Sequence, residues 1–410
     1  MDTTGDNHSI RYLDYEHYME PLWDNFSDEA DALLTTDNNG LYHTARTLRN
    51  VFLPIIVIVG LTGNTVTMLV FVSTHMKKSS ATTFLATLAF VDNVFLVALF
   101  TTWFDGSVSN IIKTESLCQI LVYVTYVTSF LSIWYVVGFT AERYIAICHP
   151  FRSVIVCSRF REKIYVIFLA VIAGVLYNYA LWTTSVVEVH GVYRCGHKFK
   201  YISLLEKVTW IDTVITMIIP FLLILLMNVK VVCKAAAFHR KRKHCLKPTD
   251  SFNGEHSRNK SRTLRSKPQM RVTRTLILVS TTFLVLNLPS HVRRLYTLII
   301  YTTTQQHTEM YHYLLQEITQ LLYYSTFSVN FFLYALYGKH FQSSLRLMLK
   351  SLKYRICCRQ THMHLDKIPS VKGSNTRGVS GELKEDIKLS LSIGIRGKRK
   401  LVDGTLSEDS

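Results

Sequence analysis

Charge is scarce in this chain, and several long stretches have none. Only 18% of the 410 residues are charged, whereas 49% are hydrophobic. A helix needs about 20 mostly apolar residues to cross a hydrocarbon layer about 30 Å thick. Runs of that length with no charge are 51–71, 116–141, 164–187 and 318–337, and runs with one or two charges are 81–104, 208–233 and 275–301. Because buried helices of soluble proteins seldom run so long without charge, we expect an all-α membrane protein, a seven-transmembrane helix bundle.

The chain also lacks the motifs of common enzymes. It has no metal-ligand spacing, no glycine-rich phosphate loop and no nucleophile motif, so we expect neither an enzyme nor a cofactor. The first forty residues contain no apolar core, which argues against a cleavable signal peptide there. We expect the first span to act as the insertion signal instead.

The charges that are present lie unevenly. Residues 1–40 contain ten acids and one base, whereas residues 234–274 contain thirteen Lys and Arg and two acids. Basic loops stay in the cytoplasm, so the sequence predicts a multi-pass protein of the plasma membrane with its N-terminus outside and its C-terminus inside. The net charge of +17 then marks membrane topology and lipid contact, and we expect no nucleic-acid partner. Sequons at Asn7 and Asn25 predict glycosylation of the outer tail.

Four segments follow from this topology. They are an extracellular acidic tail (1–48), the seven-helix bundle (49–338), a short amphipathic cytoplasmic helix with a cysteine pair (339–358) and a disordered cytoplasmic tail (359–410). Of the eight cysteines, only Cys118 and Cys195 fall on the oxidising side, so we expect a disulfide between them. Cys357 and Cys358 follow the amphipathic stretch, where we expect palmitoylation, with two free thiols as the alternative.

Charged residues within or at the edge of a membrane span are candidate functional residues. Glu142, Arg143 and Tyr144 end the uncharged run that begins at residue 116, where the helix would leave the membrane. Asp92 lies near the middle of the second span, and an ionisable side chain at that depth is costly and is usually functional. Pro220 and Pro289 would kink the fifth and sixth spans.

Together these residues resemble the rhodopsin-like (class A) G protein-coupled receptors over about residues 51–358. The resemblance rests on these positions, in order: Gly63-Asn64, Leu88-Ala89 with Asp92, Cys118 with Cys195, Glu142-Arg143-Tyr144, Pro220, Phe283 with Pro289, and Asn330 with Tyr334. It implies a heterotrimeric G protein as partner, coupled through Glu142, Arg143, Tyr144, Asn330 and Tyr334. It also implies a site for an allosteric sodium ion at Asp92, with Asn64, Ser132 and Asn330 nearby, and arrestin and receptor kinases as partners of the tail.

Three positions depart from the family pattern. Asn287 stands where the family usually has a tryptophan that is taken to switch rotamer, Phe331 replaces a proline, and Asn228 replaces a tyrosine. The resemblance therefore leaves open how the signal passes along the helices. The variant motifs are similar to those of invertebrate neuropeptide receptors of the FMRFamide and myosuppressin type.

Two positions in the sequence argue against particular classes of ligand. Thr125 stands where amine receptors have an aspartate, and Tyr324 stands where opsins have a lysine, so small amines and retinal are disfavoured. Polar residues at the outer helix ends suit an extracellular peptide, with Asp212 and Glu317 pairing a ligand arginine and Arg293 or Arg294 binding a carbonyl or carboxylate. The full set of candidates is Thr125, Tyr126, Asp212, His291, Arg293, Arg294, Gln316, Glu317 and Gln320.

Three alternatives stay open. The candidate pocket residues could pair with one another instead of with a ligand. The ligand could be a lipid or an odorant. The chain could also be a seven-span transporter or channel, although transport usually needs several deep ionisable residues and the uncharged runs leave only Asp92 at depth.

Overall fold

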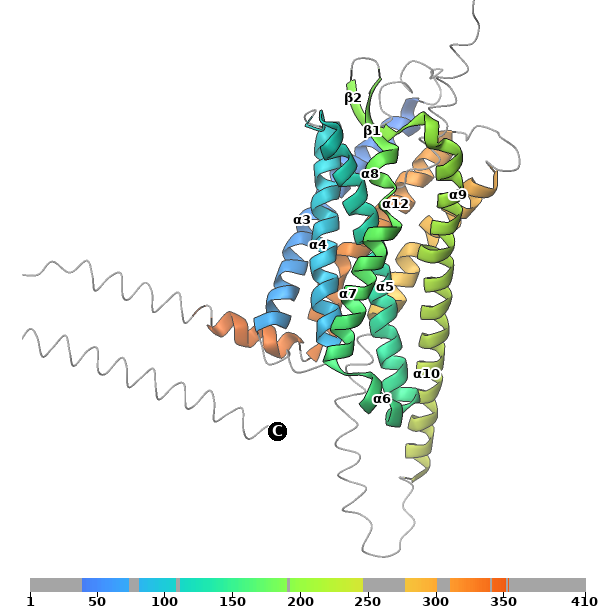
Figure 1. Ribbon diagram of the computed structural model, residues 1–410. Helices are drawn as coiled ribbons and strands as arrows, with labels where there is room; N and C mark the ends of the chain where they lie inside the picture. Colours follow the sequence, from blue (N-terminus) through green and yellow to red (C-terminus); the bar gives the residue numbers. More distant parts are fainter. Residues whose placement is uncertain are drawn as a thin grey trace, which may run out of the picture. The chain divides into compact units, whose positions relative to one another are not determined.

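The computed structural model describes residues 39–73, 81–107, 111–189, 192–245, 277–300, 310–339, 341–351 and 353. These residues form a bundle of long helices with one small β-hairpin (Figure 1). The elements are α3 (Asn39–Ser73), α4 (Ala81–Ser107), α5 (Glu115–Cys148), α6 (Pro150–Val156), α7 (Arg159–Leu176), α8 (Ala180–Thr183), β1 (Thr184–Val189), β2 (Val192–His197), η2 (Phe199–Tyr201), α9 (Ile202–Asp212), η3 (Thr213–Ile218), α10 (Ile219–Cys245) and α12 (Met310–Tyr337). Residues 277–300 and 341–351 form two further helices.

The helices account for all seven expected spans. Five have both the length and the apolar composition to cross a membrane, from α3 to the continuous helix formed by α9, η3 and α10. Helix 277–300 and α12 supply the sixth and seventh, and 24 residues of helix are about 36 Å long at 1.5 Å per residue. The prediction of an all-α seven-transmembrane bundle is confirmed. The helix of 341–351 lies in the segment where the sequence predicts an amphipathic helix.

The ends of some spans differ from the sequence-based bounds. The fourth run was expected to be helical over 164–187, but α7 ends at Leu176 and residues from Thr184 onward are a strand. Thr184 and three valines are four of the six residues of this strand, and their branched β-carbons favour extended backbone. The first helix begins at Asn39, inside the segment expected to be tail.

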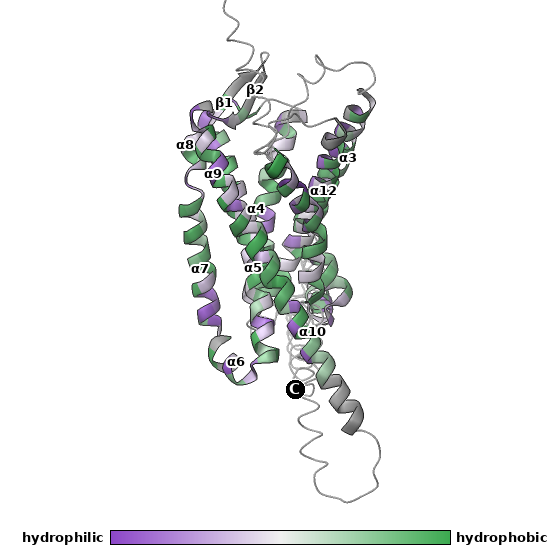
Figure 2. Cartoon of the chain, turned by 90° about the vertical axis from the view of Figure 1, so that its right-hand side faces the viewer, coloured by the Kyte–Doolittle hydropathy of each residue, from purple (hydrophilic) through white to green (hydrophobic). Residues whose placement is uncertain are grey.

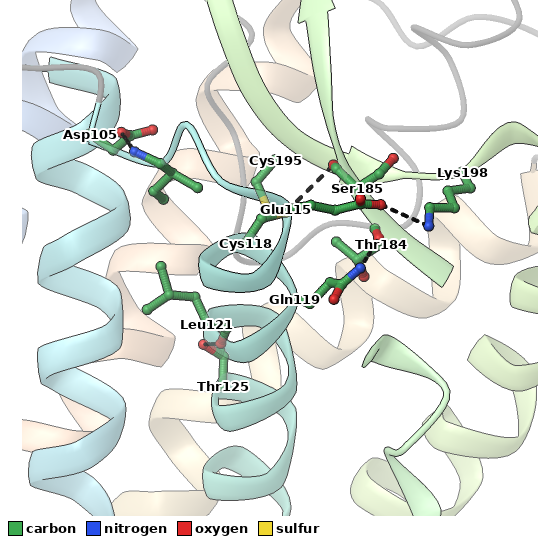
Figure 3. The surroundings of a disulfide bond; sticks show 11 residues. Asp105, Glu115, Cys118, Gln119, Leu121, Thr125, Thr184, Ser185, Cys195 and Lys198 are labelled. Carbon is green, nitrogen blue, oxygen red and sulfur yellow. Dashed lines mark hydrogen bonds and ion pairs between the residues drawn. A yellow bond between two sulfur atoms is a disulfide. The ribbon is translucent and has the colours of Figure 1, made fainter. Parts of the chain in front are cut away.

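The β-hairpin is fixed to the bundle at one end, which we call the hairpin end (Figure 1). β1 and β2 are antiparallel, with Thr184 opposite His197 and Val186 opposite Cys195. A disulfide joins Cys195 to Cys118 in the first turn of α5, with their Cα atoms 5.5 Å apart (Figure 3). The expected disulfide is therefore present. It ties the second strand to α5, while the first strand continues directly from α8.

The opposite end, which we call the α6 end, holds the turn between α5 and α7 (Figure 1). α5 stops at Cys148, and Pro150 opens α6 at a helix position where its missing N–H costs nothing. Ser158 then caps α7 by accepting a hydrogen bond from the backbone N–H of Arg161. These local signals place the end of α5, and with it Arg143, at this level of the bundle.

Apolar side chains line both the core and the outer surface. Tyr135 and Phe139 of α5 are fully buried among neighbouring helices. On the outside, Ile58 is 60% exposed and Val175 is 74% exposed, and Figure 2 shows apolar residues along most of α7. An apolar outer surface of this length suits a lipid environment.

Candidate functional site

Asp212 joins three helices at the hairpin end. Its carboxylate accepts a hydrogen bond from the Tyr177 hydroxyl at 2.5 Å and forms an ion pair with Arg294 of helix 277–300 at 2.7 Å. The side chains of Arg294 and Asp212 are 27% and 18% exposed. Asp212 is the last residue of α9, directly before the π-helical segment η3. The carboxylate therefore links the ends of the fourth, fifth and sixth spans.

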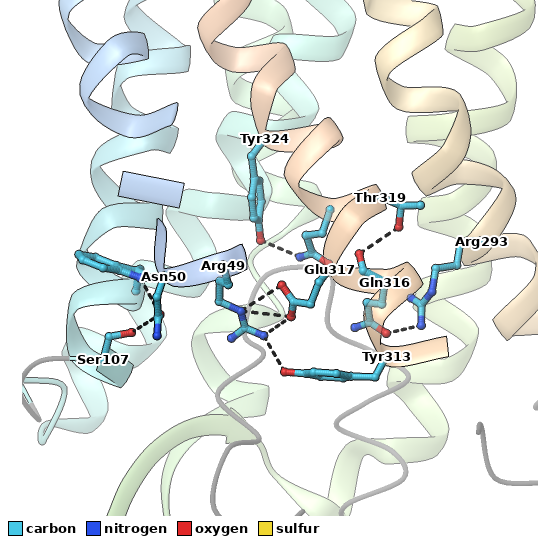
Figure 4. Close-up of polar contacts among 11 residues, drawn as sticks. Arg49, Asn50, Ser107, Arg293, Tyr313, Gln316, Glu317, Thr319 and Tyr324 are labelled. Carbon is cyan, nitrogen blue, oxygen red and sulfur yellow. Dashed lines mark hydrogen bonds and ion pairs between the residues drawn. The ribbon is translucent and has the colours of Figure 1, made fainter. Parts of the chain in front are cut away.

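A second ion pair joins the first and seventh spans at the same end. Arg49 of α3 donates from Nε to both carboxylate oxygens of Glu317 at 3.1 Å, and its Nη2 donates to the Tyr313 hydroxyl at 3.3 Å (Figure 4). Arg293 of helix 277–300 donates to the side-chain oxygen of Gln316 on α12. Glu317 and Gln316 are 3% and 2% exposed, so both contacts are well shielded from solvent.

Two pairs of candidate residues contact one another, Asp212 with Arg294 and Arg293 with Gln316, whereas Glu317 pairs with Arg49, which was not a candidate. The four charged candidates each have a partner within the chain. Of the remaining candidates, Thr125 is buried and donates to the Leu121 carbonyl of its own helix at 2.8 Å. Gln320 donates to the Tyr324 hydroxyl at 2.7 Å.

Aromatic and imidazole side chains complete the candidate set. The ring of Tyr126 packs against those of Tyr177 and Tyr179, with centroids 5.7 and 6.2 Å away. His291 lies on helix 277–300, one turn before Arg294, and is half-buried. The structure brings the Tyr126 ring next to Tyr177, whose hydroxyl binds Asp212.

In the middle of the bundle, Asp92 is fully buried. Ser132 of α5 donates to one carboxylate oxygen at 2.7 Å, and the Asn330 amide of α12 donates to the other at 2.9 Å. Asn64 does not bond to Asp92. It donates instead to the Phe327 carbonyl at 2.8 Å. Asp92 therefore connects α4, α5 and α12.

The residues around Asp92 fit a sodium ion. Asp92 has no cationic side chain within 4.0 Å among the described residues, and a lone buried carboxylate is costly unless a positive charge accompanies it. The side-chain oxygen of Asn64 is buried and has no hydrogen-bond partner in the described part of the chain. A hard cation prefers oxygen ligands. The Asp92 carboxylate and the Ser132 hydroxyl, which are in contact, supply such ligands, and the Asn64 oxygen is a further buried oxygen without a partner among the described residues.

At the α6 end, Arg143 is bonded to the preceding residue. Its Nη2 donates to Glu142 at 3.1 Å, and the two residues are 9% and 7% exposed. Tyr144 contacts His149 at 3.3 Å, and the ammonium group of Lys230 lies 5.8 Å from the Tyr144 ring centroid. Arg143 is thus held within its own helix at the bundle end that carries α6.

The three departures from the family pattern have specific contacts. Asn228 of α10 and Ser280 of helix 277–300 exchange hydrogen bonds at 2.9 and 3.0 Å. Asn287 bonds to Thr326 of α12 at 3.2 Å. Phe331 packs on Gly63 of α3, where no side chain intervenes.

Tyr334 is one turn beyond Asn330 and is 2% exposed. Its ring contacts Phe71 edge-on and Phe341 in a tilted arrangement, each with centroids 5.8 Å apart. Its hydroxyl has no hydrogen-bond partner among the described residues. The remaining predicted sites, Asn7, Asn25, Cys357 and Cys358, lie outside the described residues, as does the tail from 359 onward.

Sequence reasoning missed Arg49 and Tyr177. Arg49 stands just before the uncharged run from residue 51, at the first position of the segment assigned to the bundle, but it was not among the candidate pocket residues. A single arginine one turn from the start of a span was a usable signal. Tyr177 belongs to the turn between α7 and α8, where an apolar run gives no indication of a polar contact.

Comparison with known proteins agrees with this architecture. Residues 63–334 match the family described as 7 transmembrane receptor (rhodopsin family). The cysteinyl leukotriene receptor 2 of Homo sapiens is 30% identical over 128 residues, which cover 30% of this chain and 37% of that receptor. The neurotensin receptor type 1 of Homo sapiens is 26% identical over 221 residues, covering 50% and 51%. The QRFP-like peptide receptor of Branchiostoma floridae is 24% identical over 319 residues, covering 77% and 81%.

The first two relatives are thus matched over about a third to a half of their own lengths. The family match, by contrast, covers well over half of this chain and includes every helix from the end of α3 to α12. Members of this family are receptors and not enzymes. The chain belongs to the rhodopsin family of seven-transmembrane receptors.

Proposed function

We propose that this chain is a plasma-membrane receptor for an extracellular peptide that promotes guanine-nucleotide exchange on a heterotrimeric G protein. The observation that carries the proposal is the cluster of charged side chains at the hairpin end. Acids and bases from four helices meet there, at the end of an otherwise apolar bundle. A peptide offers backbone amides and charged side chains that match such a mixed surface.

The hairpin end is proposed to face outward. Disulfides persist in oxidising compartments, and the Cys118–Cys195 bond lies at this end. α10 ends at Cys245, within the basic segment 234–274, and so basic a segment favours the cytoplasm. The N-terminal tail, with Asn7 and Asn25, would then be extracellular. Cys357, Cys358 and the segment 359–410 would be cytoplasmic, where palmitoylation, receptor kinases and arrestin are available.

Ligand binding is proposed to exchange ion pairs within the pocket. A ligand arginine would compete with Arg294 for Asp212 or with Arg49 for Glu317. A ligand carboxylate or carbonyl would compete for Arg293 or Arg294. Because these pairs join different helices, their exchange favours a different helix arrangement. Thr125, Tyr126, His291, Gln316 and Gln320 would complete the pocket.

Two relatives are named for peptides, neurotensin and QRFP-like peptide, which supports the peptide class. A third is named for cysteinyl leukotriene, a lipid. A lipid ligand is therefore the second candidate. Its carboxylate would favour the arginines of the pocket and would leave Asp212 and Glu317 paired as they are.

The α6 end is proposed to bind the G protein. Helix opening would release Arg143 from Glu142, and Arg143 would then line the crevice beside Tyr144 and the ends of α5 and α10. Asn330 and Tyr334 would transmit the rearrangement along α12. Sodium at Asp92 would neutralise the buried carboxylate and stabilise the closed arrangement, with Asn64 and Ser132 among its ligands.

A panel of amidated neuropeptides applied to cells that express the chain tests the ligand class, with G protein activation as the readout. We expect at least one peptide to activate wild-type receptor and not mock-transfected cells. Arg143→Ala should abolish activation while peptide binding and surface expression persist. Arg161→Ala, an exposed arginine of α7, is the matched control and should signal normally. Response to lipids alone would refute the peptide assignment, and normal signalling by Arg143→Ala would refute the coupling assignment.

A further inference from the structure

The helix of residues 341–351 is attached to the bundle along one side. Phe341 is 3% exposed, and its ring meets the ring of Phe71 on α3 with centroids 5.6 Å apart. Leu345 and Met348, four and seven residues further on, pack against the same core. This spacing places the three side chains on one side of the helix. From that contact the helix leaves the bundle sideways, near the end of α3 (Figure 1).

Three exposed cations lie on the opposite side: Lys339, which is helical as well, Arg346 and Lys350. We call these three residues the basic face. Their spacing of seven and four residues brings them onto one side at 3.6 residues per turn, and Arg346 follows Phe341 by about 140° around the helix axis. Among the described residues no acidic side chain lies within 4.0 Å of the three, and residues 338–355 contain no Asp or Glu. The basic face therefore lacks a compensating charge in the described part of the chain.

Two leucines flank the basic face, one on each side. Leu347 and Leu349 are 50% and 53% exposed. A helix with a basic side and apolar flanks is typical of the interface between membrane and water. This one follows α12, a membrane span, so it begins at a membrane surface. A helix is about 10–12 Å across, close to the distance of about 8 Å over which charges act at physiological ionic strength. The basic face is therefore near enough to attract anionic lipid headgroups.

Ser343 lies within the basic face. It is four residues after Lys339, three before Arg346 and seven before Lys350, and these spacings put all four side chains on one side of a helix. Ser343 is exposed, and its hydroxyl has no hydrogen-bond partner in the part of the chain that the structure describes. Ser344, by contrast, is half-buried and lies about 100° away, on the side toward the core. A phosphate on Ser343 would be surrounded by positive charge, the setting in which a phosphoserine gains charge-assisted hydrogen bonds.

We propose that Ser343 is a phosphorylation site and that its phosphate releases helix 341–351 from anionic lipids of the inner leaflet. A protein kinase transfers the γ-phosphoryl group of ATP to the Oγ atom of Ser343. The bond between Oγ and phosphorus forms, the bond from phosphorus to the ADP oxygen breaks, and the hydroxyl proton passes to the kinase. This inference rests on the proposed topology, in which the α6 end faces the cytoplasm, where ATP and anionic lipids are available.

The phosphate changes the balance of charge at the membrane surface. A phosphoserine carries about −1.5 to −2 charges at pH 7, so it cancels at least half of the positive charge of the basic face. Lys339 and Arg346 are each one turn away from Ser343, at spacings that let opposite charges pair. Those pairs withdraw both cations from the lipid headgroups, which also repel the phosphate. Because so short a helix is only marginally stable by itself, losing the lipid contact makes its outer turns open more often.

Hydrogen exchange of dephosphorylated full-length receptor in lipid nanodiscs measures this opening. Backbone amides of residues 344–351 in the wild type should exchange about tenfold more slowly in discs that contain phosphatidylserine than in discs of phosphatidylcholine alone. Ser343→Glu should reduce this difference to about twofold, because it cancels one of the three charges of the basic face. Ser343→Gln is the matched control, since it has the size of glutamate without the charge, and it should keep the full difference. Receptor phosphorylated at Ser343 should exchange at the same rate in both kinds of disc.

Purified protein kinase C, which favours serines near basic residues, provides the phosphorylated receptor, and mass spectrometry locates the phosphate. We expect phosphate on Ser343 both after this reaction and in receptor isolated from cells that express it. Phosphate absent from Ser343 in either preparation, equal exchange in the two kinds of disc, or equal exchange in Ser343→Glu and Ser343→Gln would each overturn the proposal. None of these readouts needs a peptide or a G protein. If no peptide activates the receptor while the exchange differences are present, the proposed function fails and the phosphorylation site stands.

Discussion

Gly63 lies so close to Phe331 that a Cβ atom added at Gly63 would be 2.8 Å from the Phe331 Cβ atom. This contact closes the α3–α12 interface at the position where the family pattern has a proline instead of Phe331. The phenylalanine ring also packs edge-on against Phe341, with centroids 6.2 Å apart. The bulkier residue is therefore accommodated because its neighbour on α3 has no side chain.

Gly63→Ala is expected to destabilise the bundle by about 1–3 kcal/mol, the usual cost of overpacking a filled core. Thermal unfolding of purified receptor measures the effect. Gly40→Ala, in the same helix with nothing within 4 Å of the added Cβ, is the control and should be neutral or slightly stabilising. Combining Gly63→Ala with Phe331→Ala should relieve only the contacts with the Phe331 ring atoms at 3.1 and 3.3 Å, because the Cβ atom at 2.8 Å remains. Equal melting temperatures for the two glycine variants would contradict this packing.

The Asp212–Arg294 pair predicts a coupled response to mutation. Asp212→Asn or Arg294→Gln alone leaves one partly buried charge without its partner, at a cost of about 1–2 kcal/mol after allowance for the solvent exposure of both side chains. The double variant should be less unstable than the sum of the two. The Lys198–Glu115 pair, 36% and 54% exposed, should show a coupling below about 1 kcal/mol. Equal coupling energies for the two ion pairs would contradict the expectation that the less exposed Asp212–Arg294 pair interacts more strongly.

Asp92 predicts a dependence of stability on sodium. Sodium chloride should raise the melting temperature of the wild-type receptor relative to choline chloride at the same ionic strength, because the ion binds the folded state. Asp92→Asn should remove this difference, since the neutral amide leaves no charge for the ion to balance. Thr67→Val, a fully buried site on α3, serves as the control and should keep it. A sodium effect that survives in Asp92→Asn would place the ion elsewhere.

The burial of His197 at the hairpin end predicts that the stability of the folded chain depends on pH. The side chain is 4% exposed, and neither ring nitrogen has a hydrogen-bond partner among the described residues. Burial lowers the pKa of His197 to about 4 from an ordinary value of 6.5. Between these values the unfolded chain binds a proton that the folded chain does not, so stability falls as the pH falls from about 6.5 to 4. The full loss is about 3 kcal/mol at 1.36 kcal/mol per unit.

Thermal unfolding between pH 7.5 and pH 4.5 measures this loss. The His197→Phe variant should lose less stability than wild type over the same interval, because its ring does not titrate. The difference between the two proteins isolates His197 from the other groups that titrate in this range. Parallel curves for the two proteins would show that His197 does not contribute.

The sequence was sufficient for the fold because crossing a membrane demands long apolar helices. Cys118 and Cys195 could be paired because the topology leaves only these two cysteines on the oxidising side. The partners of Asp212 could not be predicted, since Tyr177 and Arg294 come from helices whose rotation depends on packing. The end of the fourth span was missed because Thr184 to Val187 is apolar enough to continue a helix, and only its pairing with β2 makes it a strand.

The π-helical segment Thr213–Ile218 has a consequence for how the fifth span can vary. A π-turn accommodates one residue more than the α-helix around it. Deleting one residue there would restore a regular helix and rotate Asp212 by about 100° relative to Asn228, at 3.6 residues per turn. The carboxylate would then point away from Arg294 while the contact with Ser280 stayed in place. The number of residues in this one turn therefore determines how far one end of the span is rotated about the helix axis relative to the other end. This rotation does not depend on which side chains the two ends carry.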